Sequence, residues 1–198
     1  MLMIAAKNIM IAHSSQFSPQ EYLALEHNSN LRHEYRQGLV YAMAGNSDDH
    51  DEITLNLIGL IRDQVRSQGC TVRSGTVKVN YADDFFYYPD AFVICDPRDQ
   101  GDRYIKRYPK LIVEVLSPST AAFDRGEKFT DYQKLPTLEE YLLIAQDQIA
   151  VECRRRVEWS QWERERYSDP EQTLQLHSIG LEIPLLSLYR GVSWLSSR

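Results

Sequence analysis

The stretch Leu111-Ile112-Val113-Glu114-Val115-Leu116 constrains the fold most strongly, because it is an apolar run that contains a single acidic residue. Near-continuous apolar runs are typical of strands that other elements cover on both faces. A buried carboxylate is costly unless a cation or hydrogen-bond donors meet it. Two interpretations of Glu114 are therefore open: a structural role, as an ion pair or at a strand end, or a metal ligand.

The segments before this strand predict two helices. Ser18-Pro19-Gln20-Glu21 combines an N-cap serine, a proline at the first helical position and a capping-box glutamate, and Asn28-Ser29-Asn30 ends the helix. Ser47 can cap a second helix, along which apolar residues recur at helical spacing until Gln68-Gly69 stops it. Both helices have an apolar face, which is expected to pack on a sheet.

Strand signals dominate the rest of the chain. The predicted strands are Cys70–Arg73, Thr76–Tyr81, Tyr87–Ile94 and Leu111–Leu116, with hairpins around the turns Gln37-Gly38 and Gln146-Asp147. A further helix is predicted over 124–135, and a short last one over 185–188. This order predicts an α/β (α+β) domain with a mixed sheet and helices on it. The domain is expected to span residues 17–198, with residues 1–16 as an N-terminal arm.

The composition is that of an ordinary globular protein. The chain has 198 residues, of which 43% are hydrophobic and 25% charged, and its formal net charge is −6. This charge argues against coating nucleic acid by bulk attraction, but it allows an enzyme whose acidic site holds cations. Three scattered cysteines, Cys70, Cys95 and Cys153, argue against a disulfide framework or a zinc site and favour the cytoplasm. No apolar run reaches the roughly 18 residues of a membrane span.

Asp90 repeats the pattern of Glu114, because it lies alone among apolar and aromatic neighbours in YYPDAFVI (87–94). Pro89 cannot donate to a strand ladder, so it marks a strand start, an edge or a bulge, and Asp90 alone can be a plain turn residue. The two acids together indicate a shared site more strongly than either does alone. If their strands are neighbours, the carboxylates converge, and a divalent cation such as Mg²⁺ is the counter-charge that relieves their repulsion.

These residues resemble a known family. Pro89-Asp90 followed by Glu114 is similar to the PD-(D/E)xK nuclease motif. The segments 87–94, 111–120, 124–136 and 139–144 resemble the Uma2 family (DUF820), restriction-endonuclease-like proteins abundant in cyanobacteria. The resemblance covers roughly residues 17–192. It implies a restriction-endonuclease-like core with extra β-hairpins, and a Mg²⁺-dependent nuclease, with Mn²⁺ able to substitute, in which Asp90 and Glu114 bind the metal.

One position departs from the motif. Its lysine belongs two residues after Glu114, on the same strand face, but that place holds Leu116. Lys128 is the predicted substitute, because Asp124 is expected to cap the following helix and an ammonium on that helix can reach the same site. The alternative for Lys128 is an exposed helical lysine, and Lys78 is a weaker candidate for the role.

Glu34 and His50 are predicted to complete the site. Glu34 lies near a tight turn and can add an acidic ligand, or it is a surface strand charge. His50, in the first turn of a helix, can contact a metal-bound water, or it is a partly exposed residue of the capping region. The arginines at 154–156, 164 and 166, with Trp159 and Trp162, can meet a nucleic-acid backbone, although such a pattern is more often the solvated face of an outer hairpin.

The function that follows is a Mg²⁺-dependent endonuclease acting on DNA, with Asp90, Glu114 and Glu34 as metal ligands. Lys128 is expected to position the attacking water or to stabilise developing charge. Leu116 supports the main alternative, a catalytically degenerate binding or regulatory protein that keeps the nuclease fold. The many aromatic residues and the apolar N-terminal arm favour a homo-oligomer, with a dimer expected.

Overall fold

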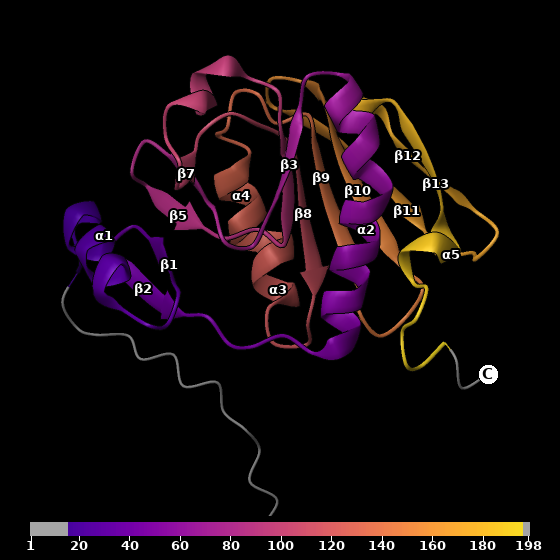
Figure 1. Ribbon diagram of the computed structural model, residues 1–198, viewed down its shortest axis with the longest axis horizontal. Helices are drawn as coiled ribbons and strands as arrows, with labels where there is room; N and C mark the ends of the chain where they lie inside the picture. Colours follow the sequence, from indigo (N-terminus) through magenta and orange to yellow (C-terminus); the bar gives the residue numbers. More distant parts are fainter. Residues whose placement is uncertain (1–15, 196–198) are drawn as a thin grey trace, which may run out of the picture.

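The computed structural model describes residues 16–195, so the expected N-terminal arm falls outside this range apart from residue 16. Its centre is a six-stranded sheet in the order β11-β10-β9-β8-β6-β3. The long helix α2 (Asp48–Ser67) covers one face, and α3 (Ala121–Phe123) and α4 (Phe129–Tyr132) cover the other (Figure 1). A mixed sheet flanked by helices confirms the predicted class. Within residues 16–195, no helix combines the length and apolar character needed to cross a bilayer.

The central strand of the large sheet is β8. The strands of this sheet are β3 (Thr71–Ser74), β6 (Ala91–Ile94), β8 (Pro109–Leu116), β9 (Glu140–Ala145), β10 (Val151–Glu158) and β11 (Gln161–Tyr167). Neighbouring strands run antiparallel except β8 and β9, which are parallel. A parallel pair needs a crossover, which the helical segment 121–132 supplies. β8 thus has a strand on each side and helices on both faces, as its apolar run predicts.

A smaller sheet, in the order β2-β1-β5-β4-β7, lies to the left of the large one in Figure 1. Its strands are β1 (His33–Arg36), β2 (Leu39–Ala42), β4 (Lys78–Tyr81), β5 (Phe85–Tyr87) and β7 (Ile105–Lys106). Helix α1 (Pro19–Asn28) packs against it through an aromatic cluster. The remaining elements are η1 (Pro97–Gln100), β12 (Thr173–Leu176), η3 (His177–Ile179), β13 (Leu181–Pro184) and α5 (Leu185–Leu188).

Local capping and turn signals are confirmed. The Glu21 N–H donates to the Ser18 hydroxyl at 3.2 Å, and the Ser18 N–H donates to the Glu21 carboxylate at 2.8 Å, which completes the capping box. Ser47 caps α2 with its side chain. Gln37 and Gly38 have φ values of 47° and 91°, as the tight turn of a two-residue β-hairpin requires.

Successive side chains of β8 point to opposite faces of the sheet, and each face packs into its own apolar cluster. Val113 and its odd-numbered neighbours face α2, whereas Ile112 and Leu116 face Tyr132 of α4. Glu114 lies on this second face, between Ile112 and Leu116. The apolar residues therefore surround the one acid of the strand with packed side chains rather than with solvent.

The single strand predicted over Tyr87–Ile94 is wrong. β5 ends at Tyr87 in the small sheet, and β6 begins at Ala91 in the large sheet. Pro89 lies between them and has no N–H for a ladder, so the pairing stops and the chain crosses from one sheet to the other. Asp90 therefore lies at the junction of the two sheets rather than within a strand.

The helix predicted over 124–135 begins earlier and ends earlier. α3 starts at Ala121, whose N–H donates to the Ser117 carbonyl at 3.0 Å, and α4 ends at Tyr132. Asp124 is not a cap: it opens a single π-helical turn, η2 (Asp124–Lys128), inside the helical segment. The capping pattern predicted too late a start because the loop that follows β8 already forms the first turn of the helical segment. Isolated π turns are rare and are often found at functional sites.

Cys70 and Cys95 form a disulfide, which contradicts the expectation drawn from the scattered cysteines. β3 and β6 are antiparallel with Thr71 opposite Ile94, so the next position outward places Cys70 opposite Cys95. Their Cα atoms are 4.3 Å apart. Strand register, and not spacing along the chain, brings these two residues together. Cys153 is free and buried.

Candidate active site

Glu114 lies near the end of β8 on the face that α4 covers, and only 3% of its surface is exposed. The Tyr132 hydroxyl donates to its Oε1 at 3.0 Å. Leu116, two residues further along the same face, is packed in the apolar cluster beneath α4. Apolar packing therefore fills the strand position that the motif gives to lysine.

Lys128 brings an ammonium to Glu114 from the helical side. Its Nζ lies 3.0 Å from Oε1 of Glu114 and 3.1 Å from Oε1 of Glu34. Asp124, at the other end of the π turn, contributes Oδ1 at 3.6 Å. The Lys128 side chain is buried together with Glu114 and Asp124, and the side chain of Glu34 is 13% exposed. The structure thus brings together one lysine and three acids that come from a helix and from both sheets.

The π turn holds Lys128 in this direction. The Tyr141 hydroxyl donates to the Asp124 carbonyl oxygen at 3.0 Å, which fixes the start of the turn. The Lys128 Nζ also lies 5.2 Å from the centre of the Tyr87 ring. Sequence reasoning missed both tyrosines, because an aromatic residue in an apolar strand gives no signal of what its ring or hydroxyl contacts.

Glu34 reaches the site from β1 of the smaller sheet. Its Oε1 accepts the Tyr88 backbone N–H at 2.9 Å, and its side chain is 13% exposed. The weaker lysine candidate, Lys78, is not part of this site: its Nζ lies 4.0 Å from Glu26 and 5.0 Å from the centre of the Tyr88 ring. Lys128 is therefore the lysine that accompanies the acidic residues.

Asp90 lies beside Glu114 at the junction of the sheets. β6 and β8 are adjacent antiparallel strands, and their register continues to this pair. Oδ2 of Asp90 accepts the Val115 N–H at 2.7 Å, and Oδ1 lies 2.9 Å from Nε2 of His50. His50, in the first turn of α2, thus contacts Asp90 rather than solvent, and both interactions fix the orientation of the carboxylate.

Burial and repulsion together set the charge of the cluster. Burial raises the pKa of Glu114; Lys128 opposes this rise, and the carboxylates of Asp124, Asp90 and Glu34 add to it. Burial likewise raises the pKa of Glu34. Burial alone lowers the pKa of Lys128, but the surrounding carboxylates outweigh it and raise that pKa. One ammonium therefore faces several carboxylates, and the site favours additional positive charge.

The donor set fits a hydrated divalent cation. Glu34 and Glu114 each present one oxygen to Lys128, and among residues 16–195 their second oxygens have no hydrogen-bond partner. Mg²⁺ prefers carboxylate oxygens and keeps several waters, so few protein ligands are enough. In the described part of the chain, no three His, Cys, Asp or Glu side chains are already gathered as a metal site. An ion here would share its carboxylates with Lys128.

Four arginines of the β10–β11 hairpin make internal contacts, namely Arg154, Arg155, Arg156 and Arg166, whereas Arg164 is exposed. Arg154 lies 2.7 Å from Glu152 and 4.3 Å from the centre of the Phe129 ring. Arg156 donates to two backbone carbonyls just after α4, at 2.8 and 3.0 Å. These contacts tie the hairpin to the helical segment and favour the structural interpretation of this patch.

The fold and the family comparison give the class of the protein. A mixed sheet carries an acid on its central strand, a second acid at a Pro-Asp step and a buried lysine beside Glu114. The chain belongs to the Uma2 family, because the model of that family, described as "Putative restriction endonuclease", matches residues 19–186. The resemblance noted in the sequence is confirmed.

Relatives support the same assignment. An uncharacterized Synechocystis sp. protein, slr1290, is 36% identical over 191 residues, covering 93% of this chain and 100% of the relative. A second, sll1609, is 32% identical over 157 residues, covering 78% of this chain and 89% of the relative. A crystal structure described as a putative nuclease belonging to DUF820 from Anabaena variabilis shares the fold, with a TM-score of 0.74 at 20% identity. The match covers 90% of this chain and 99% of that one.

Proposed function

We propose that this protein is a Mg²⁺-dependent endonuclease that hydrolyses phosphodiester bonds in DNA. The observation that carries the proposal is the buried contact of Lys128 with Glu114, at 3.0 Å, in a chain that lacks the usual lysine on the strand. The family description supports the nuclease class, and DNA is the substrate that a restriction endonuclease cleaves. Mn²⁺ is expected to substitute for Mg²⁺.

Each residue of the site has a proposed role. Glu114, Asp90 and Glu34 hold the cation, which when bound supplies a water of lowered pKa and neutralises phosphate charge. Lys128 orients the attacking water and stabilises charge that develops on the phosphate. His50 acts through Asp90, whose carboxylate it orients at 2.9 Å, and is a positioning residue.

Cleavage of supercoiled plasmid tests the proposal. The wild type is expected to nick the plasmid with Mg²⁺ or Mn²⁺ and not with EDTA. Lys128→Met and Glu114→Gln are each expected to lower the rate by at least about 100-fold, the usual effect of losing a charge-stabilising group. Lys110→Met is the matched control, because Lys110 lies on the same strand as Glu114 but pairs with Glu139, 3.6 Å away. Metal-independent nicking, or full activity of Lys128→Met, would contradict the proposal.

A catalytically degenerate binding or regulatory protein is the second candidate. Leu116 favours it, because the strand position of the motif's lysine holds an apolar side chain. This candidate predicts that wild-type protein binds DNA but leaves plasmid intact at every divalent cation concentration. Location in the cytoplasm and assembly as a homodimer both remain predictions.

A further inference from the structure

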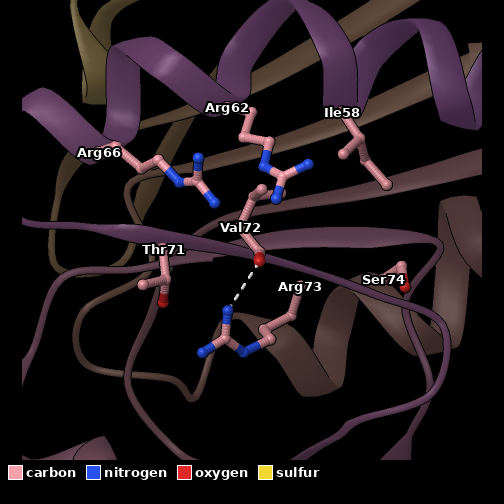
Figure 2. Close-up of a pocket in the computed structure, with 7 residues that line it drawn as sticks. All are labelled: Ile58, Arg62, Arg66, Thr71, Val72, Arg73 and Ser74. Carbon is pink, nitrogen blue, oxygen red and sulfur yellow. Dashed lines mark hydrogen bonds between the residues drawn. The ribbon is translucent and has the colours of Figure 1, made fainter.

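A basic groove lies between α2 and β3, away from the hairpin arginines that the sequence singled out. It encloses about 210 Å³, and three of the residues that line it are Arg62, Arg66 and Arg73. Figure 2 shows the guanidinium groups of Arg62 and Arg66 directed from α2 toward β3, with that of Arg73 below the strand. All three arginines are exposed.

These arginines have no acidic partner in the described part of the chain. Neither Arg62 nor Arg66 makes an ion pair or a side-chain hydrogen bond among residues 16–195, and Arg73 donates only to the Val72 carbonyl oxygen at 3.0 Å. Six arginines elsewhere are ion-paired, namely Arg36, Arg98, Arg107, Arg154, Arg155 and Arg166, so the groove differs from them in holding together three guanidinium groups without an acidic partner among the described residues. Like charges one helical turn apart, as at positions 62 and 66, are destabilising, so an anion that binds both would relieve a cost.

The open edge of β3 adds backbone donors to the groove. β3 is the last strand of the large sheet and pairs only with β6 among the described strands. The 4.3 Å separation of Cys70 and Cys95 is that of a non-hydrogen-bonded pair. Because such pairs alternate along the ladder, the N–H groups of Val72 and Ser74 point to the open edge. Their carbonyl oxygens accept local donors, the Arg73 guanidinium and the Thr76 and Val77 N–H groups. Guanidinium groups and free N–H groups together are the donors that phosphate oxygens accept.

Both walls of the groove lead from the candidate active site. Ser74 on β3 pairs with Ala91, which follows Asp90 directly. α2 begins beside Asp90 with His50 and rises about 1.5 Å per residue, so Arg62 lies on the order of 18 Å along the helix. At about 3.4 Å per base pair, that separation corresponds to roughly five base pairs of duplex.

We infer that this groove binds backbone phosphates of the DNA whose scissile phosphate lies at the acidic cluster. The inference rests on the proposed function for its choice of ligand. Arg62 and Arg66 contact phosphate oxygens on one strand, and Arg73 and the open edge of β3 complete the binding of the same stretch. The contacts are to phosphate, so they add affinity without base specificity.

The test is the affinity for a fluorescein-labelled 20-base-pair duplex, measured by anisotropy in EDTA so that no cleavage occurs. Arg62→Gln/Arg66→Gln is expected to raise Kd by about tenfold or more and to reduce the slope of log K against log salt by about two, since two phosphate contacts are lost. Arg103→Gln/Arg190→Gln is the matched control, because it removes the same charge from two exposed arginines that lie outside both the groove and the hairpin patch. This control is expected to stay within about twofold of the wild type.

Three outcomes overturn the inference: wild-type protein that does not bind the duplex, equal weakening by both double variants, or an unchanged salt slope in Arg62→Gln/Arg66→Gln. Binding to vesicles of phosphatidylglycerol and phosphatidylcholine, without binding to the duplex, would assign the groove to an anionic lipid surface instead. A wild type that binds the duplex through these arginines but never nicks plasmid would refute the endonuclease proposal and leave the groove assignment standing.

Discussion

At the scale of single residues, Lys128 links the stability of the protein to its proposed chemistry. Its ammonium contacts the buried Glu114 and the largely buried Glu34, so little solvent can replace it as their counter-charge. Removing one partner of a buried ion pair leaves an uncompensated charge, whereas a pair at the surface contributes little. Lys128 is therefore expected to matter for folding even in the absence of substrate and metal.

Replacement of this lysine tests that expectation. Lys128→Met is expected to lower the free energy of unfolding by about 3–5 kcal/mol, because the carboxylates of Glu114 and Glu34 lose their counter-charge. Urea denaturation followed by circular dichroism measures the change. Lys110→Met, which removes the contact with Glu139, is expected to change it by about 1 kcal/mol or less. Equal effects of the two variants would show that the acidic cluster does not depend on Lys128.

The residues of the candidate site differ in how far the sequence could predict them. Asp90 and Glu114 stood out as lone acids in apolar runs, and Lys128 followed from the gap at Leu116. Glu34 belongs to the other sheet, so only the packing of the two sheets brings it to Lys128. Contacts of this kind depend on three-dimensional arrangement and leave no pattern in the local sequence.

At the scale of elements, short-range signals predicted what neighbouring residues decide. The capping box of α1, the cap of α2 and the Gln37-Gly38 hairpin each depend on a few adjacent residues, and all three are present. The failures lie where tertiary contacts decide. The chain changes sheet at Pro89, and the helix after β8 starts before Asp124 and contains a π turn.

The disulfide between β3 and β6 gives a prediction at this scale. Burial raises the pKa of the Cys153 thiol to about 12, so it should not react with a thiol reagent at pH 8 in the folded protein. The oxidised protein is therefore expected to show no reactive thiol when folded and one in denaturant. Reduction in denaturant should then reveal all three cysteines.

Titration with a chromogenic disulfide reagent measures these thiols. Because the disulfide closes a loop between residues 25 apart in the sequence, its reduction is expected to lower the free energy of unfolding by about 3 kcal/mol. Three reactive thiols in unreduced, denatured protein purified without reductant would show that Cys70 and Cys95 are not paired.

At the scale of the whole molecule, the charge is distributed unevenly. The chain has a net charge of −6, yet three arginines without an acidic partner among the described residues line one groove between α2 and β3, while four acids meet Lys128 or Glu114 at the junction of the two sheets. Such a distribution suits a polyanion that is held at a basic groove and meets a cation at an acidic centre. The acids meet there because Glu34 lies on a strand of the small sheet, Glu114 lies on a strand of the large sheet, and Asp90 lies where the chain passes from one sheet to the other.

The most direct measurement is a calorimetric titration of Mn²⁺ into the metal-free protein, with Asp90→Ala, Glu114→Gln and the exposed-site control Asp63→Ala measured in parallel. We expect saturable binding to the wild type and to Asp63→Ala, and a loss of that binding in the two variants of the acidic cluster. A wild type that takes up no Mn²⁺, or an Asp90→Ala variant that binds it as the wild type does, would contradict the assignment of these carboxylates to a metal.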